Sequence, residues 1–173
     1  VRMSTRQGEF VTLRELLDEV GRDAARFFFL MRRSNSPLDF DLELAKKHSQ
    51  ENPVYYAQYA HTRVASLVRH ARQAGRASQE DRERLATSSE IAILRILWQY
   101  PYLLVQCARL MAPHLLTVYL KDLATAYHSF YDRHRVVTDD PALTRARLEL
   151  SRAVQAVLKD GLELLGVSAP DKM

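Results

Sequence analysis

Residues 52–75 read "NPVYYAQYAHTRVASLVRHARQAG", and this segment carries the signals for both ends of one helix. Asn52 can accept hydrogen bonds from the first free N–H groups, and Pro53 suits the first helical position. Gly75 is typical of the residue that follows a last helical turn. No Gly or Pro lies between these ends, so the segment predicts an unbroken helix over 52–74.

Helix signals recur on both sides of this segment. Thr12 and Glu15 form a capping box before an apolar repeat of helical period. Ser36-Pro37 favours an extended connection, and Pro101 is expected to kink a helix or to divide it in two. The predicted helices cover 12–32, 41–48, 52–74, 88–98, 102–111, 113–134 and 142–165, with an exposed polar loop over 76–85. With no stretch that alternates like a strand, the sequence predicts an all-α bundle.

Composition sets the class of protein more than its function. A chain of 173 residues is large enough for one domain with a core, and 47% hydrophobic residues exclude disorder as a description of the whole. The net charge of +4 is compatible with an anionic partner, but an ordinary solvated helical surface gives similar counts. Cys107 is the one cysteine, which favours a reducing compartment. We see no apolar stretch of transmembrane length, and we predict a cytoplasmic protein without a membrane partner.

No arrangement of residues predicts an independent active site. The histidines and Cys107 lack the spacing of metal ligands, so no metal site is predicted. Neither G-x-x-x-x-G-K nor G-x-G-x-x-G, the usual nucleotide-binding turns, occurs in the chain. The sequence therefore favours a binding function over catalysis by this chain alone.

A helical wheel divides residues 52–74 into two faces. One face is apolar and predicts the core contact, and it consists of Ala57, His61, Val64, Val68 and Ala71. The second face lies about 120° away and carries Asn52, Tyr56, Tyr59, Arg63, Ser66 and His70. Aromatic rings beside a guanidinium suit stacking with single-stranded bases. On physical grounds alone, tyrosines packed between helices explain the pattern better.

Positive charge follows the same segment. Residues 52–77 contain no acid but hold Arg63, Arg69, Arg72 and Arg76, which predicts contacts with phosphates. A second aromatic group lies in "YHSFYDRHRV" at 127–136, where we expect Phe130 in the core and Tyr131 as the exposed ring.

Five strings in this order resemble one family. They are "RMSTRQG" at 2–8, "DAAR" at 23–26, "NPVYYAQYAHTR" at 52–63, "YHSFYDRHRV" at 127–136 and "LKDGLELLGVSAPDKM" at 158–173. Together they resemble the C-terminal part of bacterial arginyl-tRNA synthetases, which are class I enzymes. The first string resembles the K-M-S-K-S loop and the second the D-A-L-R tetrad of the anticodon-binding domain.

The resemblance implies a division of the chain and a function. Residues 1–11 would end a catalytic domain, 12–50 would form connecting helices, and 51–173 would form the anticodon-binding domain. The full enzyme would activate arginine with ATP, together with Mg²⁺, and transfer it to tRNA(Arg), as a monomer with no DNA partner. The ATP loop would be Arg2, Met3, Ser4, Thr5 and Arg6, in which Arg2 and Thr5 depart from the two lysines of the signature. The fragment alone would bind tRNA without catalysis and without a cofactor.

The resemblance also implies the residues that bind the anticodon. Tyr56, Tyr131 and the terminal Met173 are expected to line a pocket for one splayed base, with Tyr59 and Arg63 as second choices. Without the resemblance, residues 166–173 would be predicted to be a frayed tail. Two other readings are a helical protein-interaction bundle without a nucleic-acid role and an intact small ligase, which the lack of a complete nucleotide site disfavours.

Overall fold

The computed structural model describes residues 12–71 and 74–173, and this part of the chain contains helices and no strand. The all-α prediction is confirmed. The helices are α1 (Leu13–Leu30), α2 (Leu42–Lys46), α3 (Pro53–His70), α4 (Gln79–Arg82), α5 (Ser88–Leu110), α6 (His114–Arg133) and α7 (Pro141–Leu164).

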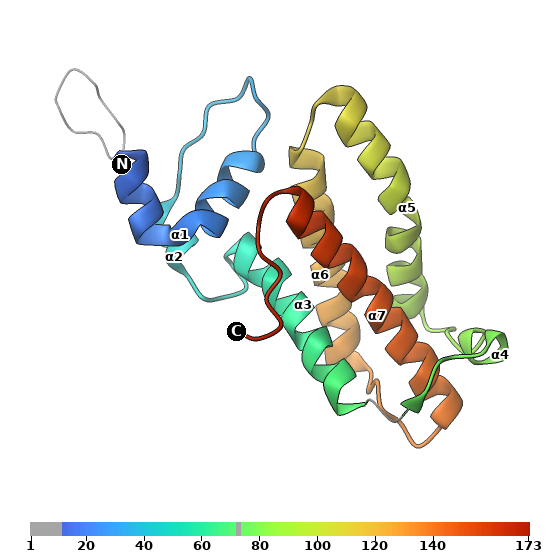
Figure 1. Cartoon of the computed structure of the whole chain (residues 1–173). Coiled ribbons are helices and arrows are strands. Elements are labelled where there is room, and N and C mark those ends of the chain that lie inside the picture. The colour runs from blue at the N-terminus through green and yellow to red at the C-terminus, as the bar shows by residue number, and fades with distance from the viewer. Residues whose placement is uncertain (1–11, 72–73) are drawn as a thin grey trace.

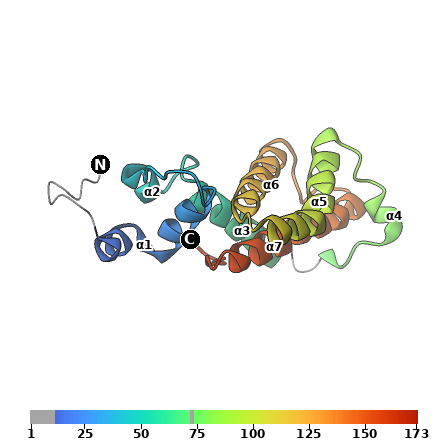
Figure 2. The same ribbon diagram turned by 90° about the horizontal axis from the view of Figure 1, so that it is seen from above.

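Four long helices form an elongated bundle (Figure 1). α3 packs against α6 and α7, and α5 packs against the same two helices from the other side. α1 and α2 lie together at one end of the bundle and α4 lies at the other, as the view from above shows (Figure 2). α1 also contacts α3 and α6, so it is joined to the bundle rather than separate from it.

The core lies where α3, α6 and α7 meet. Its fully buried side chains include Ala57, Ala60, Val64, Leu120, Leu123, Tyr127, Phe130, Val154, Leu158 and Leu162. Gly161 of α7 lets α6 approach closely, because a Cβ atom there would lie 2.6 Å from Cδ2 of Leu120. The absence of a side chain at Gly161 therefore leaves the space that the Leu120 side chain fills.

Helix α1 is bent at Gly21, where the sequence predicted a continuous helix over 12–32. The predicted capping box is present, with the Thr12 N–H donating to Glu15 at 2.7 Å. Gly21 has φ 78° and ψ 164°, a conformation that other residues rarely adopt. The glycine thus turns the second half of α1 toward the end of the bundle.

Two further expectations about local structure are corrected, the division of a helix at Pro101 and the loop over 76–85. Pro101 lies inside one continuous helix, α5, so of the two alternatives for this proline the division is wrong. The Tyr119 hydroxyl donates to the Ile96 carbonyl at 2.9 Å, next to the Leu97 carbonyl, which loses its helical donor because Pro101 has no N–H. The stretch 76–85 contains the short helix α4, which begins with a capping box between Ser78 and Asp81.

Helix α5 has a buried side and an unusually apolar outer side. Ile93 and Tyr100 face the bundle, whereas the outer side exposes Leu94, Trp98, Tyr102 and Val105. By length and composition alone, α5 is apolar enough to cross a membrane, with a mean hydropathy of 1.2. The expectation that no segment reaches this length and apolarity is therefore corrected.

A buried ion pair joins α5 to α7. Glu90 is fully buried and accepts a hydrogen bond from Nε of Arg147 at 2.7 Å. It also accepts from the Thr87 N–H at 2.8 Å, which completes the cap of α5. Burial opposes the charged carboxylate, but the hydrogen bonds from Thr87 and Arg147 outweigh it and lower the pKa of Glu90. Arg147 also donates to the Arg135 carbonyl at 2.7 Å, so one side chain fixes the loop after α6.

Removal of Arg147 should destabilise the fold, because a buried charge without its partner is unfavourable. Arg147→Met leaves the Glu90 carboxylate buried without its cation, and we expect the free energy of unfolding to fall by about 3–5 kcal/mol. Adding Glu90→Gln should recover part of that loss, because the charge is gone and the cap oxygen stays. Urea denaturation measures both variants. As a control, Arg82→Met removes an exposed pair with Glu149 and should cost less than about 1 kcal/mol; equal losses in the two arginine variants would contradict the account.

A second pair predicts a dependence on pH. Asp81 accepts from Arg145 at 2.8 and 2.9 Å and from the Ser78 N–H at 2.9 Å. The hydrogen bond with Arg145 is the largest of the effects that lower the pKa of Asp81, from 3.8 to about 2. The contribution to stability is therefore complete above pH 3.8 and is lost as the pH falls toward 2. The unfolding free energies of the wild type and Asp81→Asn should converge over this interval; a constant difference would contradict the assignment.

Candidate nucleic-acid interface

Aromatic residues of α3 and α6 meet in one cluster. Tyr56 and Tyr59 of α3 contact the His128 ring of α6, with centroids 4.4 and 5.5 Å apart. Arg63 lies one turn further along α3, and its guanidinium carbon is 4.0 Å from the centroid of the Tyr131 ring. We call Tyr56, Tyr59, Arg63, His128 and Tyr131 the α3–α6 aromatic cluster. Four of the predicted site residues therefore lie together.

The local sequence explains why these side chains meet. Positions 56, 59 and 63 share one face of α3, while Ala57, Val64 and Ala60 face the core. On α6, Tyr127 and Phe130 are fully buried, which directs His128 and Tyr131 toward α3. Phe130 is in the core and Tyr131 is partly exposed, as the sequence predicted.

The positive charge of the cluster is that of Arg63, which is held by a neighbouring carboxylate and by two rings. Arg63 stacks on Tyr131, lies 5.8 Å from the Tyr59 centroid and pairs with Asp132 at 3.5 Å. A guanidinium held between rings keeps donors available at its edge. Burial lowers the pKa of His128, and the charge of Arg63 adds to this effect although the Tyr56 carbonyl opposes it. The imidazole is therefore neutral near pH 7 and acts as an aromatic plate between the tyrosines.

A cleft of about 490 Å³ opens beside Tyr131. Its lining combines apolar Leu67, Val136 and Val137 with the polar residues Asp132, Arg133, His134 and Arg135. Arg133 and Arg135 are exposed and sit where α6 ends. Neither arginine was predicted as a site residue from the sequence, because their place beside a cleft depends on how the loop after α6 folds back.

The end of the chain lies along α3, on a face of the helix other than the one that carries Tyr56 and Tyr59. The Thr62 hydroxyl and the Nδ1–H of His61 donate to the Pro170 carbonyl at 2.8 and 3.0 Å. Arg69 donates to the Asp171 carbonyl at 3.2 Å, so this arginine holds the chain end and is not solely a free cation for phosphate. Met173 follows two residues later with its side chain 54% exposed. Residues 166–171 are thus held by hydrogen bonds, which the prediction of a frayed tail did not include.

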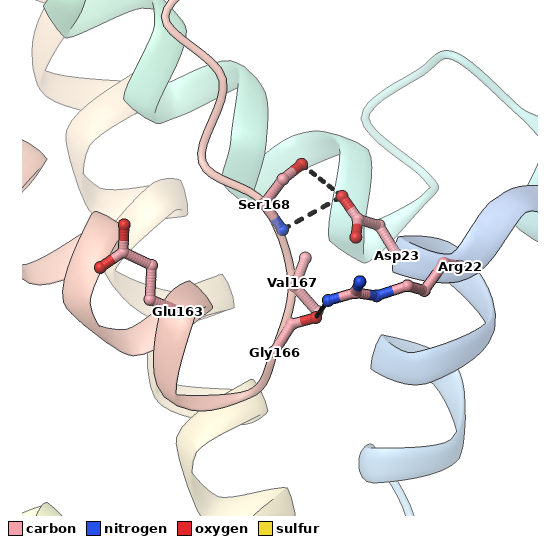
Figure 3. Close-up of a pocket in the computed structure, with 6 residues that line it drawn as sticks. All are labelled: Arg22, Asp23, Glu163, Gly166, Val167 and Ser168. Atoms are coloured by element: carbon pink, nitrogen blue, oxygen red, sulfur yellow. Dashed lines mark hydrogen bonds between the residues drawn. The ribbon is translucent and has the colours of Figure 1, made fainter.

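A second pocket, of about 430 Å³, lies where α1 meets the end of α7 (Figure 3). Asp23 accepts from the Ser168 N–H at 3.1 Å and from its hydroxyl. Arg22 donates to the Gly166 carbonyl at 3.2 Å, and Arg26 donates to the Leu165 carbonyl. Asp23 and Arg26, the first and last residues of the "DAAR" string, therefore both bind the segment that follows α7.

Some predicted residues cannot be placed. Arg2, Met3, Ser4, Thr5, Arg6 and Arg72 lie outside the described residues. Within 12–71 and 74–173, no group of three or more His, Cys, Asp or Glu residues could hold a metal ion.

Comparison with known proteins identifies the family. Residues 57–173 match the DALR anticodon binding domain. The chain is 55% identical to an arginine–tRNA ligase of Syntrophotalea carbinolica and 54% identical to one of Desulfosudis oleivorans, in each case over all of this chain and 32% of the relative. It therefore spans about a third of the length of the curated relatives it matches.

Solved structures agree. A Campylobacter jejuni protein described as an arginyl-tRNA synthetase superposes with a TM-score of 0.81 and 28% identity, over 96% of this chain and 36% of that one. The arginyl-tRNA synthetase of Thermus thermophilus gives 0.77 and 29% identity, over 98% and 29%. Because the family model matches more than half of the chain and the helices superpose, this chain belongs to the DALR anticodon-binding domain family.

Proposed function

We propose that this chain binds the anticodon region of tRNA through the α3–α6 aromatic cluster. The observation that carries the proposal is that three tyrosines, a histidine and a guanidinium share one partly exposed surface beside a cleft with Arg133 and Arg135. A splayed base needs an aromatic face for stacking, and the flanking phosphates need cations. Both kinds of group are present within two adjacent helices.

The likeness to arginine–tRNA ligases supports a role within a longer enzyme. That enzyme would activate arginine with ATP and Mg²⁺ in the cytoplasm, as a monomer, and transfer arginine to tRNA(Arg). Arg2, Met3, Ser4, Thr5 and Arg6 would then belong to its ATP loop, and this chain alone would bind tRNA without catalysis. Here, the domain would position the tRNA while the rest of the enzyme performs the chemistry.

A protein-interaction role is the alternative, and the outer side of α5 favours it. Trp98 and Tyr102 are 74% and 63% exposed there, on a helix far from the aromatic cluster. Apolar contacts depend weakly on salt, whereas phosphate contacts make the logarithm of the binding constant fall linearly with the logarithm of salt concentration. A salt titration of RNA binding therefore separates the two functions.

The aromatic cluster makes a prediction about stacking. Tyr131→Ala should weaken binding to an RNA stem-loop with the sequence of an arginine tRNA anticodon arm by about 1–3 kcal/mol, roughly 5- to 150-fold. Tyr131→Phe keeps the ring and should retain most of the affinity. Tyr102→Ala, an exposed tyrosine of α5, is the matched control and should bind like the wild type. Equal losses at positions 131 and 102 would contradict the proposed site.

The chain end makes a second prediction. Deletion of Lys172 and Met173 should leave the melting temperature nearly unchanged, because the hydrogen bonds at Ser168, Pro170 and Asp171 remain. It should weaken stem-loop binding by about 0.3–1.5 kcal/mol, the range for a thioether against a ring. Combined with Tyr131→Ala, the loss should be less than additive if both side chains serve one base. Unchanged affinity after the deletion would remove Met173 from the site.

A further inference from the structure

Three charged residues of α1 meet the chain just after α7 ends. Arg22 and Arg26 donate to the carbonyls of Gly166 and Leu165, which belong to the unsatisfied C-terminal end of α7. Asp23 lies between them and accepts from the Ser168 N–H, the second peptide after Gly166 (Figure 3). We call this arrangement the α1 clasp, and it consists of Arg22, Asp23, Arg26 and their contacts with residues 165–168.

The turn inside the α1 clasp leaves no room for another residue than glycine. Gly166 has φ +69°, and a Cβ atom there would lie 2.5 Å from Nε of Arg26. The bend at Gly21 directly precedes Arg22 and turns this part of α1 toward the same point. Both glycines therefore serve the contact between α1 and the end of α7.

The α1 clasp is the first of a series of contacts that lead along α3. Gln58 donates to Asp23 at 3.1 Å and to the Ser168 carbonyl at 3.0 Å, so it joins all three elements. One helical turn further, His61 and Thr62 hold Pro170, and Arg69 then holds Asp171. The contacts follow the chain in order from residue 165 to residue 171, and only Lys172 and Met173 extend beyond them.

We propose that Asp23 is a positioning residue for RNA binding, acting through residues 166–173. It fixes the direction in which the chain leaves α7, and so it sets the path of the following residues along α3 before RNA arrives. If the chain end is already ordered in the free protein, RNA binding does not carry the entropy cost of ordering it. This inference rests on the proposed function, because it assigns Asp23 a part in the same RNA site without contact to the RNA.

The sign of one substitution distinguishes positioning from electrostatics. Asp23→Asn removes a negative charge from a protein that binds a polyanion, so electrostatics alone would strengthen RNA binding. Positioning predicts the opposite, because one charged carboxylate oxygen of Asp23 accepts from both Ser168 and Gln58, and a neutral amide oxygen accepts these hydrogen bonds more weakly. We expect stem-loop binding by the 173-residue chain to be about two- to tenfold weaker, the same range as for loss of the thioether contact. Asp18→Asn, an exposed acid on the first half of α1, is the matched control and should bind as well as the wild type or slightly better.

Amide hydrogen exchange, measured without RNA, reports whether the chain end stays bound to α1. The Ser168 N–H should exchange faster in Asp23→Asn and at the wild-type rate in Asp18→Asn, with circular dichroism unchanged in both. Ser168→Ala removes only the hydroxyl contact and should give a smaller loss of RNA affinity, which keeps the test available if Asp23→Asn is poorly folded. The loss from Asp23→Asn should also be less than additive with deletion of Lys172 and Met173.

The outcomes separate this inference from the proposed function. If the wild-type chain binds the stem-loop and Asp23→Asn binds it equally or more tightly, the positioning role is wrong. It is also wrong if Ser168 exchange does not change. If the wild-type chain fails to bind RNA at all, the proposed function fails, and with it the part of this inference that concerns RNA.

Discussion

The burial of one small-residue face of α3 is the constraint on which the other features depend. Ala57, Ala60 and Val64 are fully buried against α6 and α7, so α3 cannot rotate about its axis. That contact fixes the direction of the two remaining faces. One face carries Tyr56 and Tyr59 to His128, and the other carries Gln58 and Thr62 to the chain end. The α3–α6 aromatic cluster and the contacts of the chain end are thus both consequences of how a core helix is packed.

Polar interactions then select one arrangement of the helices among those that apolar packing allows. The Glu90–Arg147 pair lies in the interior and must be matched, because an unpaired charge there is costly. The pair links α5, α7 and the loop after α6, next to the cleft that holds Arg133 and Arg135. At the other end of the bundle, hydrogen bonds from Arg22 and Arg26 and to Asp23 join α1 to the residues that follow α7. The surface between these two ends is therefore held from both sides.

Local signals in the sequence predicted most helices and part of the α3–α6 aromatic cluster. Caps at Thr12 and Asn52 start helices because they act within three residues, and the spacing of Tyr56, Tyr59 and Arg63 needs only the helical period. Features that depend on contacts between residues far apart in the sequence were not predicted. Pro101 lies inside a continuous α5, near a hydrogen bond from a hydroxyl of α6. The His128 ring lies against tyrosines only because α3 and α6 pack together. Asp23 and Ser168 are 145 residues apart, so no local pattern could join them.

The most direct measurement is a filter-binding titration of the 173-residue chain with an arginine-accepting tRNA and with the same tRNA carrying a changed anticodon. The α3–α6 aromatic cluster, acting on a splayed anticodon base, predicts that the change weakens binding, and that the affinity for both tRNAs falls as salt concentration rises. Equal affinity for the two tRNAs, with no dependence on salt between low and physiological ionic strength, would contradict anticodon recognition by this domain.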